Sequence, residues 1–192
     1  MKTVEPSFPF RLDTLREEDI PAVMDIERRA FSLPWNAGIY RYELRYNALS
    51  FYRAIRTSGP PLPPIVAYGG IWLYAPEAHV STIAVHPEFR GLHLGAWLLA
   101  DLLVEAARRD AQEASLEVRV SNVTAQRLYL SFGFRVVGKR HRYYSDNRED
   151  AFIMTLRPLD ITVLEQRLFR EERIVKERWR ARAPDILASY PS

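Results

Sequence analysis

Four segments between Val80 and Met154 constrain the fold of this chain more than any other feature of its sequence. In chain order they lie at 81–99, 115–122, 124–134 and 142–154. Strand-like and helix-like patterns alternate through them, which is typical of an α/β domain whose helices pack on a sheet. A chain of 192 residues has room for one such core, or for one core with an appendage.

The helical and strand patterns of this region are regular. The strongest helical pattern extends from Leu94 to Arg109, and its apolar positions are Leu98, Leu99, Leu102, Leu103 and Ala106. A second apolar helical stripe consists of Ala125, Leu128, Tyr129 and Phe132. Gly133 follows this stripe at the position where glycine commonly ends a helix. Between the two helices, Leu116, Val118 and Val120 alternate with charged residues, which predicts a half-buried strand.

The flanking regions supply further elements. Residues 19–31 have helical spacing, and a second short helix is predicted after the interruption at Pro34. Strands are predicted at 51–56, 65–74 and 79–85, and the proline-rich run 57–64 is predicted to be a loop. The segments 135–144 and 151–156 predict a closing hairpin.

Composition excludes several classes of protein. The sequence has no apolar run long enough to span a membrane, and its first ten residues lack the apolar segment of a signal peptide. Cysteine is absent, which removes disulfides and thiolate chemistry, so the cytoplasm is the expected location. The net charge of +3 gives no reason to expect direct nucleic-acid binding. His79, His86 and His93 lack acidic or cysteine partners at metal-ligand spacing, so no metal site is predicted.

Residues 157–192 differ from the preceding residues 1–156. They hold eight of the 27 Lys and Arg residues and six of the 24 acidic residues. An approximate helical stripe is formed by Ile161, Leu164, Leu168, Val175 and Trp179. We therefore predict an α/β domain at 1–156 and a charged amphipathic helical extension at 157–192. Packing of the extension on its own domain is favoured over binding to a partner or a membrane.

A candidate anion-binding turn precedes the strongest helix. Arg90 to Ala96 would present backbone N–H groups near a helix N-terminus, where the partial positive charge attracts phosphate. An ordinary strand-to-helix turn with a solvated arginine is an equal alternative for such a short pattern. Taken alone, Glu117 fits the solvated face of a one-sided strand, and Tyr129 fits the apolar stripe of its helix.

Together, the order and spacing of these motifs resemble the GNAT superfamily of N-acetyltransferases. Within it they resemble the RimI type, which acetylates the α-amino group at a protein N-terminus. The resemblance covers residues 10–156. It implies an α/β fold with a mixed, mostly antiparallel sheet of about six or seven strands flanked by helices on both faces. It also implies acetyl-CoA as the co-substrate, with no metal.

The resemblance assigns roles to particular positions of this sequence. Glu117 stands where the family has its general base, and Tyr129 where it has the acid that protonates the coenzyme thiolate. His93 stands where the family has the first glycine of its pyrophosphate loop, and histidine tolerates positive φ better than most residues. The implied coenzyme contacts are Ile83, Ala84, Val85, Arg90, Gly91, Leu92, His93, Leu94, Gly95, Ala96 and Asn122. A helix-capping role is an equal alternative for Asn122.

The acceptor side is implied by two further motifs. Leu33, Pro34 and Trp35 resemble the acceptor loop of the RimI type, and Tyr143 and Tyr144 resemble its paired tyrosines. A turn with a core anchor is the alternative for Pro34 and Trp35. These motifs imply a protein N-terminus as acceptor, with a ribosomal protein as the family's usual substrate. Acetylation of a small-molecule amine or a lysine, and a non-catalytic acyl-CoA-binding module, remain open alternatives.

Overall fold

One mixed sheet organises the molecule. The computed structural model describes residues 7–190, and within them the strands form a seven-stranded sheet in the order β1-β2-β3-β4-β5-β7-β6. The strands are β1 (Arg11–Thr14), β2 (Ser50–Arg56), β3 (Ile65–Tyr74), β4 (Glu77–Val85), β5 (Glu113–Arg119), β6 (Arg135–Arg140) and β7 (Ala151–Leu156). Neighbouring strands are antiparallel except for the parallel pair β4 and β5. The predicted fold class is confirmed.

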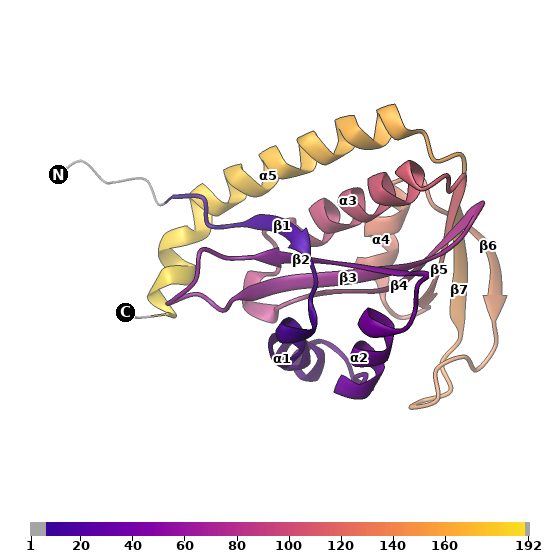
Figure 1. Ribbon diagram of the computed structural model, residues 1–192, viewed down its shortest axis with the longest axis horizontal. Helices are drawn as coiled ribbons and strands as arrows, with labels where there is room; N and C mark the ends of the chain where they lie inside the picture. The colour runs from indigo at the N-terminus through magenta and orange to yellow at the C-terminus, as the bar shows by residue number, and fades with distance from the viewer. Residues whose placement is uncertain (1–6, 191–192) are drawn as a thin grey trace.

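Helices cover both faces of the sheet (Figure 1). They are α1 (Ile20–Ala30), α2 (Ala37–Arg45), α3 (Leu94–Arg108), α4 (Val123–Ser131) and α5 (Ile161–Ala188), with short 3-10 turns at Glu17–Asp19 and Pro87–Phe89. The helices α1 and α2 lie on one face, and α3 and α5 lie on the other. Gly133 follows α4 in a left-handed conformation, which confirms the prediction that this glycine ends the helix. Its N–H donates to the Leu130 carbonyl, and the Phe134 N–H donates to the Tyr129 carbonyl.

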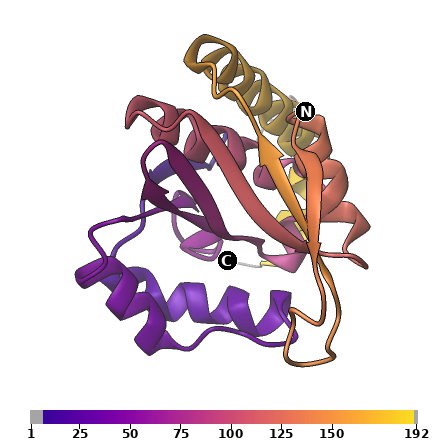
Figure 2. The same cartoon turned by 90° about the vertical axis from the view of Figure 1, so that its right-hand side faces the viewer.

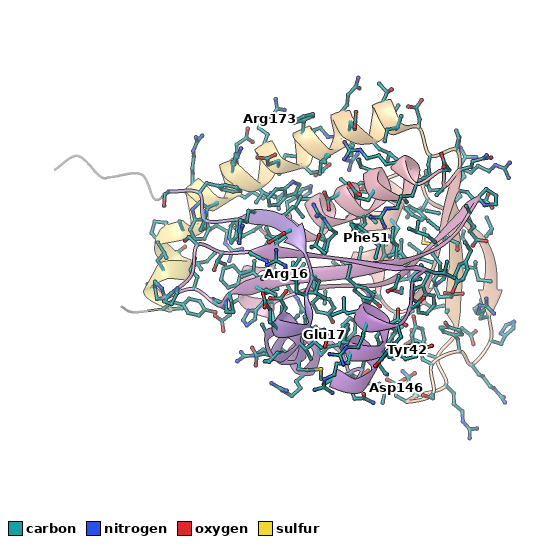
Figure 3. The ribbon with its side chains drawn as sticks, in the orientation of Figure 1. Arg16, Glu17, Tyr42, Phe51, Asp146 and Arg173 are labelled. Carbon is teal, nitrogen blue, oxygen red and sulfur yellow. The ribbon has the colours of Figure 1, made fainter. Side chains whose placement is uncertain are left out.

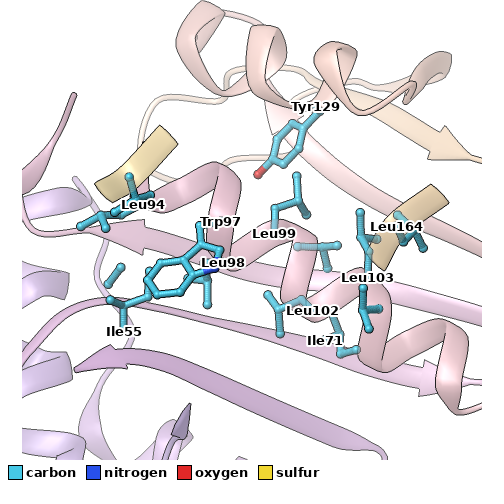
Figure 4. Close-up of a cluster of buried hydrophobic side chains, with 14 of the residues drawn as sticks. Ile55, Ile71, Leu94, Trp97, Leu98, Leu99, Leu102, Leu103, Tyr129 and Leu164 are labelled. Atoms are coloured by element: carbon cyan, nitrogen blue, oxygen red, sulfur yellow. The ribbon is translucent and has the colours of Figure 1, made fainter. Parts of the chain in front are cut away.

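The main core lies between the sheet and α3. Figure 4 shows Leu98, Leu99, Leu102 and Leu103 of α3 beside side chains of the sheet and of α5. Nearly every residue of α3 from Ala96 to Val104 is buried, because the sheet covers one side of this helix and α5 covers the other. A helix that is apolar all round needs such double coverage. A second buried cluster lies between the sheet and the α1–α2 pair.

Two local features differ from the sequence prediction. The edge strand β1 was not predicted, since its four residues carry little alternation and its structure comes from backbone pairing with β2. The strand β6 ends at Arg140, so the two tyrosines at 143 and 144 lie in the loop after it. There the Arg142 N–H donates to Asp150 Oδ1 and the Tyr144 N–H donates to the Glu149 carbonyl, which shapes the loop.

Candidate active site

The parallel strands β4 and β5 separate after a short paired stretch. Their register pairs Glu77–His79 with Glu113–Ser115, and within residues 7–190 the two strands have no further pairing. On the other edge of β4, Val80 pairs with Ile71 and Thr82 pairs with Gly70, so Ser81 is an extra residue. In Figure 2 the half of the sheet that contains β5, β6 and β7 faces the viewer. The predicted coenzyme strand, Ile83 to Val85, therefore borders a gap whose edge offers backbone groups to an extended ligand.

The turn from Arg90 to Ala96 follows β4 and opens α3. Gly91 has φ +83° and His93 has φ 72°, so both adopt the left-handed conformation. The side chains of Leu92 and Leu94 are buried in the core, which leaves only the backbone of these two residues for a ligand. The Ala96 N–H donates to the His93 carbonyl. The N–H groups of Leu94 and Gly95, which open the helix before it, form a potential anion site.

The carboxylate of Glu117 lies on β5 and is nearly buried, with 10% of its side chain exposed. Its Oε2 atom lies 3.2 Å from His79 Nε2, and its Oε1 atom accepts a hydrogen bond of 2.9 Å from Arg140 Nε. The hydrogen bond with His79, followed by the nearby Arg140 charge, holds the pKa of Glu117 below its ordinary value. Glu117 is therefore ionised at neutral pH, and it does not lie on a solvated strand face.

His79 is a site residue that sequence reasoning did not identify. Its Nδ1 atom lies 3.0 Å from Ser115 Oγ, and Ser115 donates a hydrogen bond of 2.5 Å to the exposed Glu77. The imidazole also stacks on Trp72 with ring centroids 5.6 Å apart. A polar chain thus leads from Glu117 through His79 to the surface. Only the β4–β5 register could have revealed it, because His79 and Ser115 are 36 residues apart in the sequence.

Tyr129 lies on the inward face of α4. Its side chain is buried, with Phe134 5.8 Å away between ring centroids, and Figure 4 shows its hydroxyl directed toward Leu99 of α3. Burial raises the pKa of the Tyr129 phenol, and the nearby Tyr144 adds to this effect. The phenol therefore stays protonated at neutral pH, which suits a proton donor.

Tyr143 and Tyr144 form a pair beside Glu117. Their ring centroids are 5.2 Å apart in an edge-to-face arrangement, and the guanidinium of Arg119 lies 3.8 Å from the centroid of Tyr144. Burial raises the pKa of Tyr144 to about 12, and the charge of Glu117 contributes to the raised pKa of both tyrosines. The paired tyrosines and the candidate proton-transfer residues thus lie within electrostatic range of one another.

The loop between α1 and α2 approaches the β6–β7 loop. Ser32 Oγ donates a hydrogen bond of 2.6 Å to Asp146 Oδ2, and the same carboxylate accepts one of 2.8 Å from Arg119. Figure 2 shows the two loops beside each other, and Figure 3 labels Asp146 at the tip of the second. Leu33, 57% exposed, and Pro34 project from the first loop.

Trp35 is half-buried and closes this loop on a buried carboxylate. The backbone N–H of Trp35 donates a hydrogen bond of 2.7 Å to Glu27 Oε2. The centroid of its ring lies 5.7 Å from that of Tyr40. The Tyr40 hydroxyl donates to the other oxygen of Glu27 at 2.6 Å, and the Tyr68 hydroxyl also contacts it. Trp35 therefore has the anchoring contacts of a turn residue while it borders the candidate acceptor loop. Sequence reasoning did not identify Glu27, which lies on the buried face of α1.

Asn122 caps α4. Its side-chain oxygen accepts a hydrogen bond of 3.0 Å from the Ala125 N–H, which was one of its two predicted roles. Among residues 7–190, no group of three or more His, Asp and Glu residues is arranged to hold a metal ion. No helix of this part of the chain is long and apolar enough to cross a membrane.

These residues can support transfer of an acyl group to an amine. A carboxylate for the ammonium proton, a protonated phenol for the leaving group and a strand edge for an extended thioester are the groups that such a reaction needs. Residues 20–134 match the Acetyltransferase (GNAT) family. The chain therefore belongs to the GNAT family of acetyltransferases, and the predicted enzyme class is confirmed.

Two relatives match along most of their own length. A Bacillus subtilis (strain 168) protein, provisionally named a ribosomal protein bS18-alanine N-acetyltransferase, is 41% identical over 140 residues, covering 73% of this chain and 90% of the relative. The Escherichia coli (strain K12) ribosomal protein bS18-alanine N-acetyltransferase is 34% identical over 147 residues, covering 76% of this chain and 95% of the relative. The predicted RimI-type resemblance is confirmed.

Solved structures agree with this relationship. The crystal structure of the ribosomal-protein-S18-alanine N-acetyltransferase from Escherichia coli has a TM-score of 0.70 and 32% identity, covering 78% of this chain and 94% of that chain. The structure of Arabidopsis thaliana NAA60 in complex with acetyl-CoA has a TM-score of 0.70 at 13% identity, covering 77% of this chain and 98% of that chain, and it shares the fold.

Proposed function

We propose that this chain transfers acetyl from acetyl-CoA to the N-terminal α-amine of a protein, of the ribosomal protein bS18-alanine type. The observation that carries the proposal is the nearly buried, ionised Glu117 beside Tyr143 and Tyr144. The named activities of the relatives with 41% and 34% identity support the same acceptor. The cytoplasm is the proposed location, because the proposed acceptor is a ribosomal protein.

The donor side fits an acyl-CoA. The proposed coenzyme contacts are the backbone of Ile83 to Val85 along the open edge of β4, and the N–H groups of the turn Arg90 to Ala96. Asn122 is proposed to contact the coenzyme through its amide nitrogen, which its capping bond leaves for other partners. Acetyl-CoA supplies the activated acetyl group as a thioester.

Glu117 is the proposed general base, directly or through water. An α-amine has an ordinary pKa of about 8, so neutralising it at pH 7 costs about 1 kcal/mol, whereas a lysine would cost about 4–5 kcal/mol. Contacts with His79 and Arg140 lower the pKa of Glu117 and make it a weak base. A weak base is sufficient for an α-amine, and this favours an N-terminus over a lysine.

Tyr129 is the proposed acid. The new bond joins the amine nitrogen to the acetyl carbon, and the carbon–sulfur bond breaks. The departing sulfur then takes the phenolic proton, which the raised pKa of Tyr129 keeps in place at neutral pH. Leu33 and Pro34 on one loop, and Tyr143 on the other, are proposed to contact the first residues of the acceptor peptide.

Coenzyme A release with short peptides tests the proposal. A peptide that begins with alanine should be acetylated, and mass spectrometry should locate the acetyl group on its α-amine. The same peptide with a blocked N-terminus and one internal lysine should release no coenzyme A above background. Preferred acetylation of the lysine peptide, or of small amines, would refute the N-terminal assignment. Binding of acetyl-CoA without turnover on any amine would favour a non-catalytic module.

A further inference from the structure

We propose that α5, the helix of the extension, is part of the coenzyme site: it holds the turn Arg90–Ala96 in shape, and Glu171 is the positioning residue for His93. The inference rests on the proposed function, because it takes this turn as the part that binds the coenzyme pyrophosphate. It assigns a role to the extension, which sequence analysis left without a function, and to the histidine that departs from the family's glycine.

The first contact is between His93 and Glu171. His93 Nε2 lies 2.6 Å from Glu171 Oε2, and the Glu171 side chain is fully buried. Oε2 has no partner in good hydrogen-bond geometry, so this is a close polar contact and not a well-aligned hydrogen bond. The other oxygen of Glu171 contacts Arg167 of the same helix. A buried carboxylate is thus directed at His93, the residue immediately before α3.

This contact explains how a histidine can replace a glycine here. The left-handed conformation of His93 is disfavoured for residues with a Cβ atom, and it persists where surrounding structure holds it. Glycine adopts the conformation freely and needs no tether. In this chain the imidazole is held by α5, and the side chain that replaces the glycine provides the point of attachment.

Two arginines of α5 hold the preceding residues of the same turn. Arg178 Nη1 donates to the Gly91 carbonyl at 2.7 Å, and Arg182 Nη1 donates to the Arg90 carbonyl at 2.7 Å. In a trans peptide the carbonyl and the following N–H point in opposite directions. Fixing the Arg90 carbonyl on α5 therefore directs the Gly91 N–H away from the helix, where it is available to an anion.

Close packing and charge support the same role. A Cβ atom at Gly91 would lie 2.9 Å from Arg182 Nη1, so a side chain there would displace this guanidinium. The guanidinium groups of Arg178 and Arg182 also add positive charge behind a turn proposed to bind phosphates. Trp179, 1% exposed, anchors this part of α5 through its ring contact with Phe10 at 5.0 Å.

A matched pair of variants tests the role of Glu171. Glu171→Gln removes the charge beside His93, and Glu177→Gln makes the same change at an exposed position of the same helix. We expect Glu171→Gln to raise the KM for acetyl-CoA and its calorimetric Kd about tenfold, with kcat and the peptide KM within about twofold of wild type. Glu177→Gln should match wild type in all of these.

Repeating the Glu171→Gln change in a His93→Gly variant separates a positioning role of Glu171 from a general effect on stability. The acetyl-CoA affinity of His93→Gly is the reference for this background, because glycine adopts the left-handed conformation without a tether. Adding Glu171→Gln to His93→Gly should then cause no further loss, whereas a merely structural role would give the same tenfold loss in both backgrounds. Hydrogen exchange of the 90–96 amides should be faster in Glu171→Gln, with the melting temperature reported alongside.

The outcomes distinguish this inference from the proposed function. Wild-type protein that fails to bind acetyl-CoA would overturn the proposed function. Wild-type protein that binds and acetylates, with Glu171→Gln binding acetyl-CoA equally well, would overturn only the role of α5. If Glu171→Gln does not fold, Arg178→Ala carries the test from an exposed position, and unchanged coenzyme affinity in that variant would overturn the inference.

Discussion

The proposed coenzyme end of the β4–β5 gap is built from backbone held by buried side chains, whereas the proposed acceptor end consists of exposed side chains on two loops. At the coenzyme end, Leu92 and Leu94 fix the turn in the core, and α5 contacts the turn from outside. At the acceptor end, Leu33 and Tyr143 are exposed, and a hydrogen bond between Ser32 and Asp146 joins the loops.

This difference matches what each end has to recognise. Backbone N–H groups bind any phosphate and need a fixed conformation, so a rigid frame favours affinity for one coenzyme. Peptide N-termini differ in their side chains. Recognition at the acceptor end therefore depends on a few protein side chains, and substituting them changes which peptide is preferred. Changes at the coenzyme end should therefore affect folding and coenzyme affinity, and changes at the acceptor end should affect the peptide KM.

The largest expected effect is at the coenzyme end. Trp179→Ala removes a buried ring from the α5 anchor and should lower the free energy of unfolding by about 3–5 kcal/mol. Phe169→Ala, 74% exposed on the same helix, is the control and should change stability by less than about 0.5 kcal/mol. Denaturant unfolding measures both. Equal stability of the two variants would mean that α5 does not belong to the folded frame.

The next effect is on turnover, at the junction of the two ends. Glu117→Gln should lower kcat about 10²-fold, the usual loss for a general base, while acetyl-CoA affinity stays near wild type. Tyr129→Phe should also lower kcat, by less if water can protonate the departing sulfur. Single-turnover measurements with an alanine peptide report both. Undiminished kcat in Glu117→Gln would remove Glu117 from the reaction.

A smaller loss of turnover is expected at His79, which contacts Glu117 and leads to the surface. His79→Ala should lower kcat about tenfold, the cost of losing one hydrogen bond to a charged group, with both KM values unchanged. His79→Gln keeps a donor and should recover part of the loss. His141→Ala, at an exposed position, serves as the control. Equal kcat in wild type and His79→Ala would leave His79 with only a structural role.

A substitution at the acceptor end should change the peptide KM. Tyr143→Ala should raise the peptide KM about fivefold and leave acetyl-CoA affinity unchanged, because the side chain is exposed and lies outside the coenzyme turn. Tyr74→Ala, also about half exposed, is the matched control. Steady-state kinetics with each substrate varied separates the two constants. A change in acetyl-CoA affinity instead would contradict the division between the two ends.

The smallest expected effect is on the hydrogen bond between the acceptor loops. Ser32→Ala removes an exposed hydrogen bond, which corresponds to about 0.5 kcal/mol, so the peptide KM should rise about twofold. Ser58→Ala, at an exposed position in the proline-rich loop, is the control. A change in the melting temperature without a change in the peptide KM would show that the bond only stabilises the fold.

Much of the fold followed from local patterns. The helices at 94–109 and 124–134 and the strands at 51–56, 65–74 and 151–156 were predicted because periodicity is a property of neighbouring residues. The end of α4 at Gly133 was predictable for the same reason. The short edge strand β1 was not, since it depends on pairing with β2 some forty residues later.

The candidate site was predicted in part. The turn before α3 and the acceptor motifs were recognisable as motifs, and the residues proposed for catalysis were named from their positions in the family pattern that the chain resembles. The contact of His79 with Glu117 and the hydrogen bond of Ser32 with Asp146 were not predicted, because each joins residues at least 38 positions apart. No local pattern specifies which distant side chains a strand register or a loop approach brings together.

The sequence alone therefore determined the α/β class, the order of the elements after β1, the turn before α3 and the amphipathic character of the extension, because these depend on composition and short-range spacing. The tertiary structure decided where β4 separates from β5, that Glu117 is nearly buried and paired, and that Glu171 of α5 meets His93. These outcomes depend on how the sheet pairs and which helix faces pack against it, and both are set by contacts between segments far apart in the chain.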